Sequence, residues 1–183
     1  MSNVGLVITH SADDPSNSRP PRDEIPGMAA GPPYVTRGPR TSVAIPYIQV
    51  FTTGLLIPLE VRFRAAVTPG DAESELRRLM RSDHRTGVDR LHLAVDYPDG
   101  TVTQNIDEPE NRRPGSSYRS VLLQHAGSSG PTWALGYWIR WLPTAGTVGL
   151  TVRWPSQGVI TARFELPSQA VQEAEARILD PWA

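Results

Sequence analysis

Four histidines are the side chains of this sequence with the widest use in catalysis and metal binding: His10, His84, His92 and His125. No two of them stand at the His-x-His or His-x3-His spacing that brings two imidazoles to one face of a strand or helix. A metal site would need ligands gathered from separate loops, and we expect no metal and no cofactor. The chain also has no cysteine, which removes thiolate ligands, disulfides and thiol nucleophiles.

His92 is the histidine best placed for acid–base chemistry, because it shares the polar face of a predicted strand, 88–97, with Asp96. Four residues of extended chain separate the two by about 13 Å, so they cannot pair within that strand. A Ser–His–Asp set drawn from distant segments, with Ser120 for example, stays open, although the chain lacks the Gly-x-Ser-x-Gly nucleophile elbow. A hydrolase that combines His92 or His125 with loop carboxylates is therefore the enzyme alternative.

Acidic residues cluster in one proline-bounded segment, 107–117, beside two arginines. Paired carboxylates could act as acid and base in glycoside hydrolysis or bind Ca²⁺. Charges of both signs in one such segment are more typical of a solvated loop. We therefore expect no catalytic residues there.

Arginine supplies all 18 cations, against 19 acids, so the net charge is −1. The absence of lysine excludes imine chemistry, pyridoxal phosphate enzymes and Walker-type nucleotide sites. The balanced charge gives no general attraction to nucleic acid or to an anionic membrane, and no apolar run approaches the roughly 18 residues that span a bilayer. We expect a cytoplasmic protein that binds neither, and an enzymatic role is not favoured.

The first 40 residues are expected to form a flexible arm, because residues 10–40 are polar and repeatedly broken by proline. A single domain is expected over 41–183. In its clearest segment, 55–67, alternate residues are apolar, which predicts a strand with one buried face. It meets a β-branched segment, 43–51, through Thr-Thr-Gly, so we predict a hairpin. Pro58 has the other parity and lacks an N–H, which predicts an edge or a bulge.

The last third of the chain shows the same alternation three times, and turn residues separate the strands. Eight or so strands at intervals of roughly ten residues predict an antiparallel β-sandwich, with barrel-like closure left open. Helical patterns predict a short inserted helix at about 69–82 and a C-terminal helix at about 168–179. The three strands are expected over 133–141, 148–154 and 159–166, with Ile160 on the inward parity of the last.

Two motifs of the chain carry a resemblance to a known family. The hairpin at 48–64 joins its strands through Phe-Thr-Thr-Gly, and the C-terminal third carries Trp-Leu-Pro at 141–143 and Trp-Pro-x-x-Gly at 154–158. They resemble an uncharacterised bacterial family of β-rich proteins over about a third of the chain. The helical segment at 69–85 departs from that family. Because the family carries no known activity, the resemblance implies a compact β-fold and no site.

Trp138 is the residue that most suggests a binding surface. It shares the parity of Gly136 and Arg140 and should lie on the outer face of its strand, whereas Trp133, Trp141 and Trp154 are expected in the core. An exposed tryptophan beside arginines suits a protein, peptide or glycan partner. Cover by one of the helices is the alternative. The predicted surface comprises Trp138 and Arg140, with Arg62 and Arg64 if the hairpin is adjacent.

These patterns favour a non-enzymatic interaction or binding module with an unknown protein partner. An alternative is a structural subunit of a phage-like or secretion assembly, in which the arm exchanges a strand or tethers a lattice. Self-association into a homo-oligomer stays open in either case. The hydrolase described above is the third hypothesis.

Overall fold

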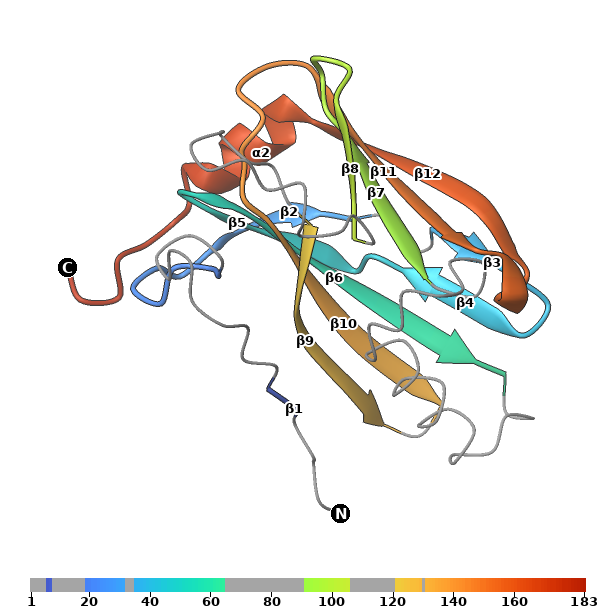
Figure 1. The fold of residues 1–183 in the computed structure, drawn as a ribbon. Helices are drawn as coiled ribbons and strands as arrows, with labels where there is room; N and C mark the ends of the chain where they lie inside the picture. Colours follow the sequence, from blue (N-terminus) through green and yellow to red (C-terminus); the bar gives the residue numbers. More distant parts are fainter. Residues whose placement is uncertain (1–5, 8–18, 32–34, 65–90, 106–120, 130) are drawn as a thin grey trace, which may run out of the picture.

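A computed structural model describes residues 6–7, 19–31, 35–64, 91–105, 121–129 and 131–183. In these ranges the chain forms two packed antiparallel sheets and a C-terminal helix, and neither sheet closes into a barrel (Figure 1). The prediction of a mainly β, antiparallel sandwich is confirmed, without the barrel-like closure. The helix predicted at 69–82 lies outside the described residues.

The larger sheet has eight strands among the described residues, in the order β1-β9-β10-β6-β4-β3. Strand β5 pairs with the other part of β6 and carries β2 on its far side. The bounds are β1 Leu6–Val7, β2 Gly27–Ala30, β3 Thr36–Arg37, β4 Thr41–Ala44, β5 Tyr47–Phe51, β6 Gly54–Phe63, β9 Val121–Ser129 and β10 Thr132–Ile139.

The smaller sheet has the order β12-β11-β7-β8. A 3-10 turn, η2 (Pro155–Gln157), links β11 to β12, and β12 leads directly into the helix α2 (Ser168–Glu175). The strand bounds are β7 His92–Asp96, β8 Val102–Gln104, β11 Thr147–Trp154 and β12 Val159–Pro167.

The predicted hairpin is confirmed, with one correction. Residues 43–51 do not form a single strand, because Pro46 interrupts it between β4 and β5. Both pieces pair with the same side of β6, β5 along 54–56 and β4 along 60–63. Pro58 lies between these stretches, where its missing N–H leaves no ladder bond unmade on that side.

Several details of the strands and of the helix differ from the sequence predictions; β10, for example, ends at Ile139 and not at the predicted 141. β9 continues through 126–129, although the glycine and serines there are typical of a loop, because it pairs with β10 to Ser129. The ladder between β11 and β12 shifts register between Val152 and Trp154, so Val159 is buried and Ile160 is 80% exposed. α2 ends at Glu175, before the predicted 179.

Part of the predicted N-terminal arm contributes strands. β2 pairs with β5 and β3 pairs with β4, so the larger sheet begins before residue 41. Both strands are very short, and neither shows an alternation that would distinguish it from a loop. They are extended because a neighbouring strand supplies the hydrogen-bond partners.

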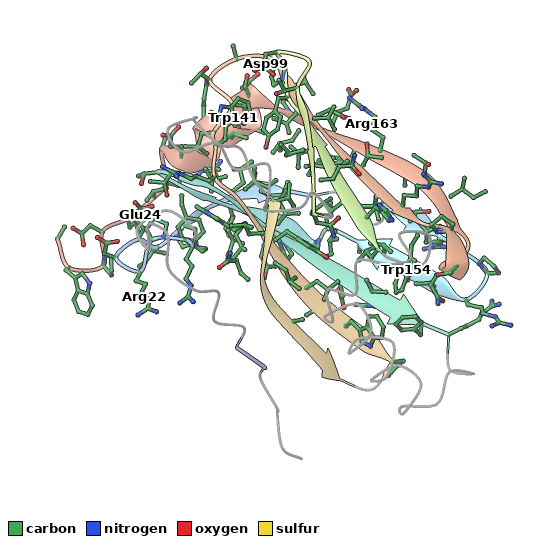
Figure 2. All side chains as sticks on the ribbon, in the orientation of Figure 1. Arg22, Glu24, Asp99, Trp141, Trp154 and Arg163 are labelled. Carbon is green, nitrogen blue, oxygen red and sulfur yellow. The ribbon has the colours of Figure 1, made fainter. Side chains whose placement is uncertain are left out.

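The core lies between the sheets and holds the alternate apolar residues of the long strands. At one end Phe63 and Trp133 pack with ring centroids 4.5 Å apart, and Trp154 of the opposite sheet lies 5.9 Å from Trp133 (Figure 2). These contacts join the two layers and confirm that Trp133 and Trp154 are core residues. The indole N–H of Trp133 is buried and has no hydrogen-bond partner among the described residues, a cost of about 1–3 kcal/mol that the packing must offset.

Tyr137 places a hydroxyl inside the core, where Asn105 provides its partner. The Asn105 side chain accepts a hydrogen bond from the Leu93 N–H (3.0 Å) and donates to the Leu91 carbonyl (2.9 Å). It thereby takes the place of a strand partner for this part of the chain, beyond the last residue of β8. Its Nδ2 also donates to the Tyr137 hydroxyl at 3.3 Å. Burial raises the pKa of Tyr137 from 10.0 to about 12, and the Asn105 bond lowers it slightly.

We predict that alkali selectively destabilises the fold through Tyr137. Its contribution is complete below pH 10, where both folded and unfolded states hold the proton. It is lost as the pH rises from 10 to about 12, because only the unfolded state then ionises, and the loss approaches about 3 kcal/mol. Ultraviolet titration should show a tyrosine ionising near pH 12, and Tyr137→Phe should remove that step. Persistence of the step in Tyr137→Phe would contradict the assignment.

Candidate functional site

Trp138, the centre of the predicted surface, is buried. Its exposed fraction is 0%, and it packs edge-on against Phe51 with centroids 5.7 Å apart. Its cross-strand neighbours Leu56 and Leu122 are apolar, so this end of the outer face is itself a small core. A Cβ on Gly54 would lie 2.8 Å from the Trp138 ring, which indicates how closely the hairpin covers it. The expectation of an exposed tryptophan is therefore wrong.

The three predicted arginines are exposed but do not gather. Arg62 pairs with Thr132, whereas Arg140 follows Ile139, which pairs with Leu55 at the other end of the same ladder. Seven residues of strand separate the two ends by about 23 Å. Arg64 follows β6 at the end near Arg62.

Arg62 also has a local partner, because its guanidinium donates to the Glu60 carboxylate at 2.8 and 3.0 Å. β6 and β10 are adjacent, as the predicted surface required. Their antiparallel register nevertheless places Arg62 and Arg140 at opposite ends of the ladder, so the predicted surface is divided into two parts.

His92 and Asp96 do not pair with each other, because they lie four residues apart on one extended strand. His92 lies opposite Arg153 in the ladder, and Asp96 is four residues further along β7. The Asp96 carboxylate forms an ion pair with Arg163 and accepts a hydrogen bond from Thr151 at 3.5 Å.

Other members of that alternative lie outside the described residues. They are Ser120 and the acidic segment at 107–117. The backbone of the alternative histidine, His125, lies in β9 opposite Gly136. The remaining histidines, His10 and His84, also lie outside the described residues. Among the residues that are described, no group of three or more His, Asp or Glu side chains could hold a metal ion.

A surface that the sequence analysis missed lies where the C-terminal segment meets the residues before β2. Ile25, Leu179 and Trp182, hereafter the C-terminal patch, are 48%, 60% and 85% exposed. The N–H of Ile25 donates to the Leu179 carbonyl at 2.8 Å, and the reverse bond is 3.1 Å. The Asp180 carboxylate accepts the Trp182 N–H at 2.8 Å, which turns the chain after Leu179. The patch thus combines large exposed apolar side chains with a hydrogen-bonded backbone.

Two neighbouring elements hold the C-terminal patch in place. On the α2 side, Val171 and Ala174 are fully buried, and the last turn is closed by the bond from the Ala176 N–H to the Gln172 carbonyl at 3.0 Å. On the N-terminal side, the Glu24 carboxylate accepts the Thr52 N–H at 2.9 Å, which ties the segment before Ile25 to the β5–β6 turn (Figure 2).

The sequence offered only one local signal of this surface, the Asp-Pro pair at 180–181, which is typical of a turn. The pairing of Ile25 with Leu179 joins segments more than 150 residues apart and has no local signature.

Comparison with protein-family models, with curated proteins and with solved structures finds no match for this chain. The resemblance to a β-rich bacterial family therefore stays a prediction. Of the described helices, none has the length and apolar character needed to cross a membrane. Function has to be argued from the surface of the molecule itself.

We predict that Trp138 and Arg140 have opposite roles. Trp138→Ala should lower the free energy of unfolding by about 3–5 kcal/mol, because it empties a closed aromatic site. Arg140→Ala should change it by less than about 0.5 kcal/mol, since the side chain is exposed. Urea denaturation measures both. A Trp138→Ala protein as stable as the parent would restore Trp138 as a candidate for binding.

Proposed function

We propose that the protein is a non-enzymatic binding module and that the C-terminal patch contacts its protein partner. The observation that carries the proposal is the coincidence of exposure with order at Ile25, Leu179 and Trp182. Exposed apolar side chains are ordinary when they are scattered singly. Here three of them come from two segments that are hydrogen-bonded to each other.

The chemistry of the patch suits a protein surface. Tryptophan is enriched among the residues that dominate interface energies, and removal of one commonly costs 2 kcal/mol or more. Because hydrogen bonds already fix the backbone on both sides, little conformational entropy would be lost on binding. Arg22 and Glu24, which shortly precede Ile25, place charges of both signs at the border, as in the polar rim of an interface.

The other hypotheses have less support. No arrangement of described residues favours a hydrolase, and several of its candidate side chains lie outside the described ranges. A structural subunit of an assembly could use the same patch. The two hypotheses then differ only in whether the partner is part of a larger assembly. The cytoplasmic location stays a prediction.

The test is site-specific photo-crosslinking in cells of the native host. A benzophenone amino acid at position 182 should give a covalent adduct with a discrete protein. The same probe at Val102, which is 51% exposed on β8 of the other sheet, should not. Leu179→Asp should abolish the adduct at 182 without unfolding the protein, because that side chain is exposed. No adduct, or the same adducts from both positions, would contradict the proposal.

With a partner identified, titration gives the size of the effect. Trp182→Ala should weaken binding by about 30-fold or more, which corresponds to about 2 kcal/mol. Val102→Ala should leave the affinity within about threefold, as expected for a residue outside the interface.

A further inference from the structure

β12 is a long edge strand of the smaller sheet. It is nine residues long, with β11 on one side. No strand among the described residues pairs with its other side. β3 lies close to β12, and the chain after β3 lies beside the residues that precede β12, since a Cβ on Gly38 would lie 2.7 Å from the Gln157 carbonyl oxygen.

The backbone of β12 defines which groups point outward. The Ser168 N–H donates to the Gly146 carbonyl at 2.9 Å, in register with the ladder between β11 and β12. In an antiparallel pair, alternate residues direct both backbone groups to the same neighbour. Residues 162, 164 and 166 therefore face β11, while 161, 163, 165 and 167 face outward. Pro167 is in the outward set, so its missing N–H costs no bond to β11.

The side chains near the middle of β12 are complementary to a second copy of the same strand. If two copies pair antiparallel about an axis at Phe164, Arg163 of one lies opposite Glu165 of the other, and the reverse pair forms on the other side of the axis. These residues also carry the outward backbone groups that such a ladder needs. An axis at Arg163 or Glu165 would instead place like charges directly opposite each other, which is destabilising.

Arg163 lies on the outer face of β12. Its guanidinium forms an ion pair with Asp96 and lies 3.6 Å from Glu165 (Figure 2). It reaches Asp96 across Gly149, where a Cβ would lie 2.6 Å from the Arg163 Cζ. Because Asp96 lies on β7, beyond β11, the guanidinium is directed away from the β12 edge. The Arg163 side chain is half-exposed, and in the pairing with a second copy it exchanges Asp96 for the other copy's Glu165.

The inner face of β12 also favours pairing with a second copy. Ala162 and Phe164 lie on the parity of the buried Leu166, yet both are only part-buried because the core stops at this edge. A second copy would cover them, with Phe164 opposite its counterpart and Ala162 opposite the other copy's Leu166.

We propose that two copies of the protein associate through the edges of β12, in antiparallel register about a two-fold axis at Phe164, and join their smaller sheets into one continuous sheet. The contact is independent of the C-terminal patch. Because an edge-to-edge contact belongs to the smaller class of interfaces, we expect a dissociation constant in the micromolar range, roughly 1–100 μM.

Sedimentation equilibrium of the full chain tests the dimer. The parent should shift from monomer to dimer as its concentration rises through the micromolar range. Arg163→Glu alone and Glu165→Arg alone should each weaken association tenfold or more, and the double exchange should restore it, because opposite charges again face each other. Arg153→Glu changes the same charge on β11, away from the edge, and should leave association unchanged.

Cysteine crosslinking tests the register. The chain has no cysteine, so Phe164→Cys introduces the one thiol and should give a disulfide-linked dimer under mild oxidation, while Ala162→Cys should not. Circular dichroism checks that each variant is folded. A parent that remains monomeric at all concentrations, or a dimer that Arg163→Glu leaves intact, would overturn the proposal. A dimer crosslinked through Ala162→Cys and not through Phe164→Cys would overturn the register.

Discussion

The inner face of the eight-stranded sheet is wider than the four-stranded sheet that packs against it, and α2 covers the remainder (Figure 1). Val171 and Ala174 of α2 are fully buried and belong to the same core as β2 and β5. The helix approaches so closely that Gly27 of β2 has no space for a side chain, since a Cβ would lie 3.2 Å from the Ala174 Cα and nearer to its carbonyl. The position of the C-terminal patch follows from this contact between α2 and β2.

The C-terminal patch and the outer edge of β12 both depend on how α2 and the smaller sheet cover the larger sheet. Because α2 ends beside β2, the chain that leaves it runs past Ile25 and pairs with it through Leu179, and the C-terminal patch forms there. β12 is an edge strand of the smaller sheet, and Ala162 and Phe164 on its inner face are part-buried. The first surface is apolar and suits a different protein, whereas the second is charged in a self-complementary order.

The sequence predicted the features that depend on local burial. Alternation along β6, β10 and β11 identified those strands and most of their inward residues, since one face of each is covered throughout. Trp138 was assigned to the correct face but with the wrong exposure, because Phe51 and Gly54 cover it across the sheet. Ile160 was misplaced by a register shift that alternation cannot reveal. The C-terminal patch escaped prediction since it requires a pairing between distant segments.

The docking of α2 on β2 is tested most directly by Gly27→Ala, followed by hydrogen exchange and mass spectrometry. The account predicts faster exchange in 168–178 and 27–30 and a loss of about 1–3 kcal/mol in stability, because the added methyl group forces the helix from the sheet. Gly127→Ala is the matched control, since a Cβ there meets nothing within 4 Å, and it should leave exchange in both segments unchanged. Unchanged exchange and stability in Gly27→Ala would contradict the claim that this contact closes the core.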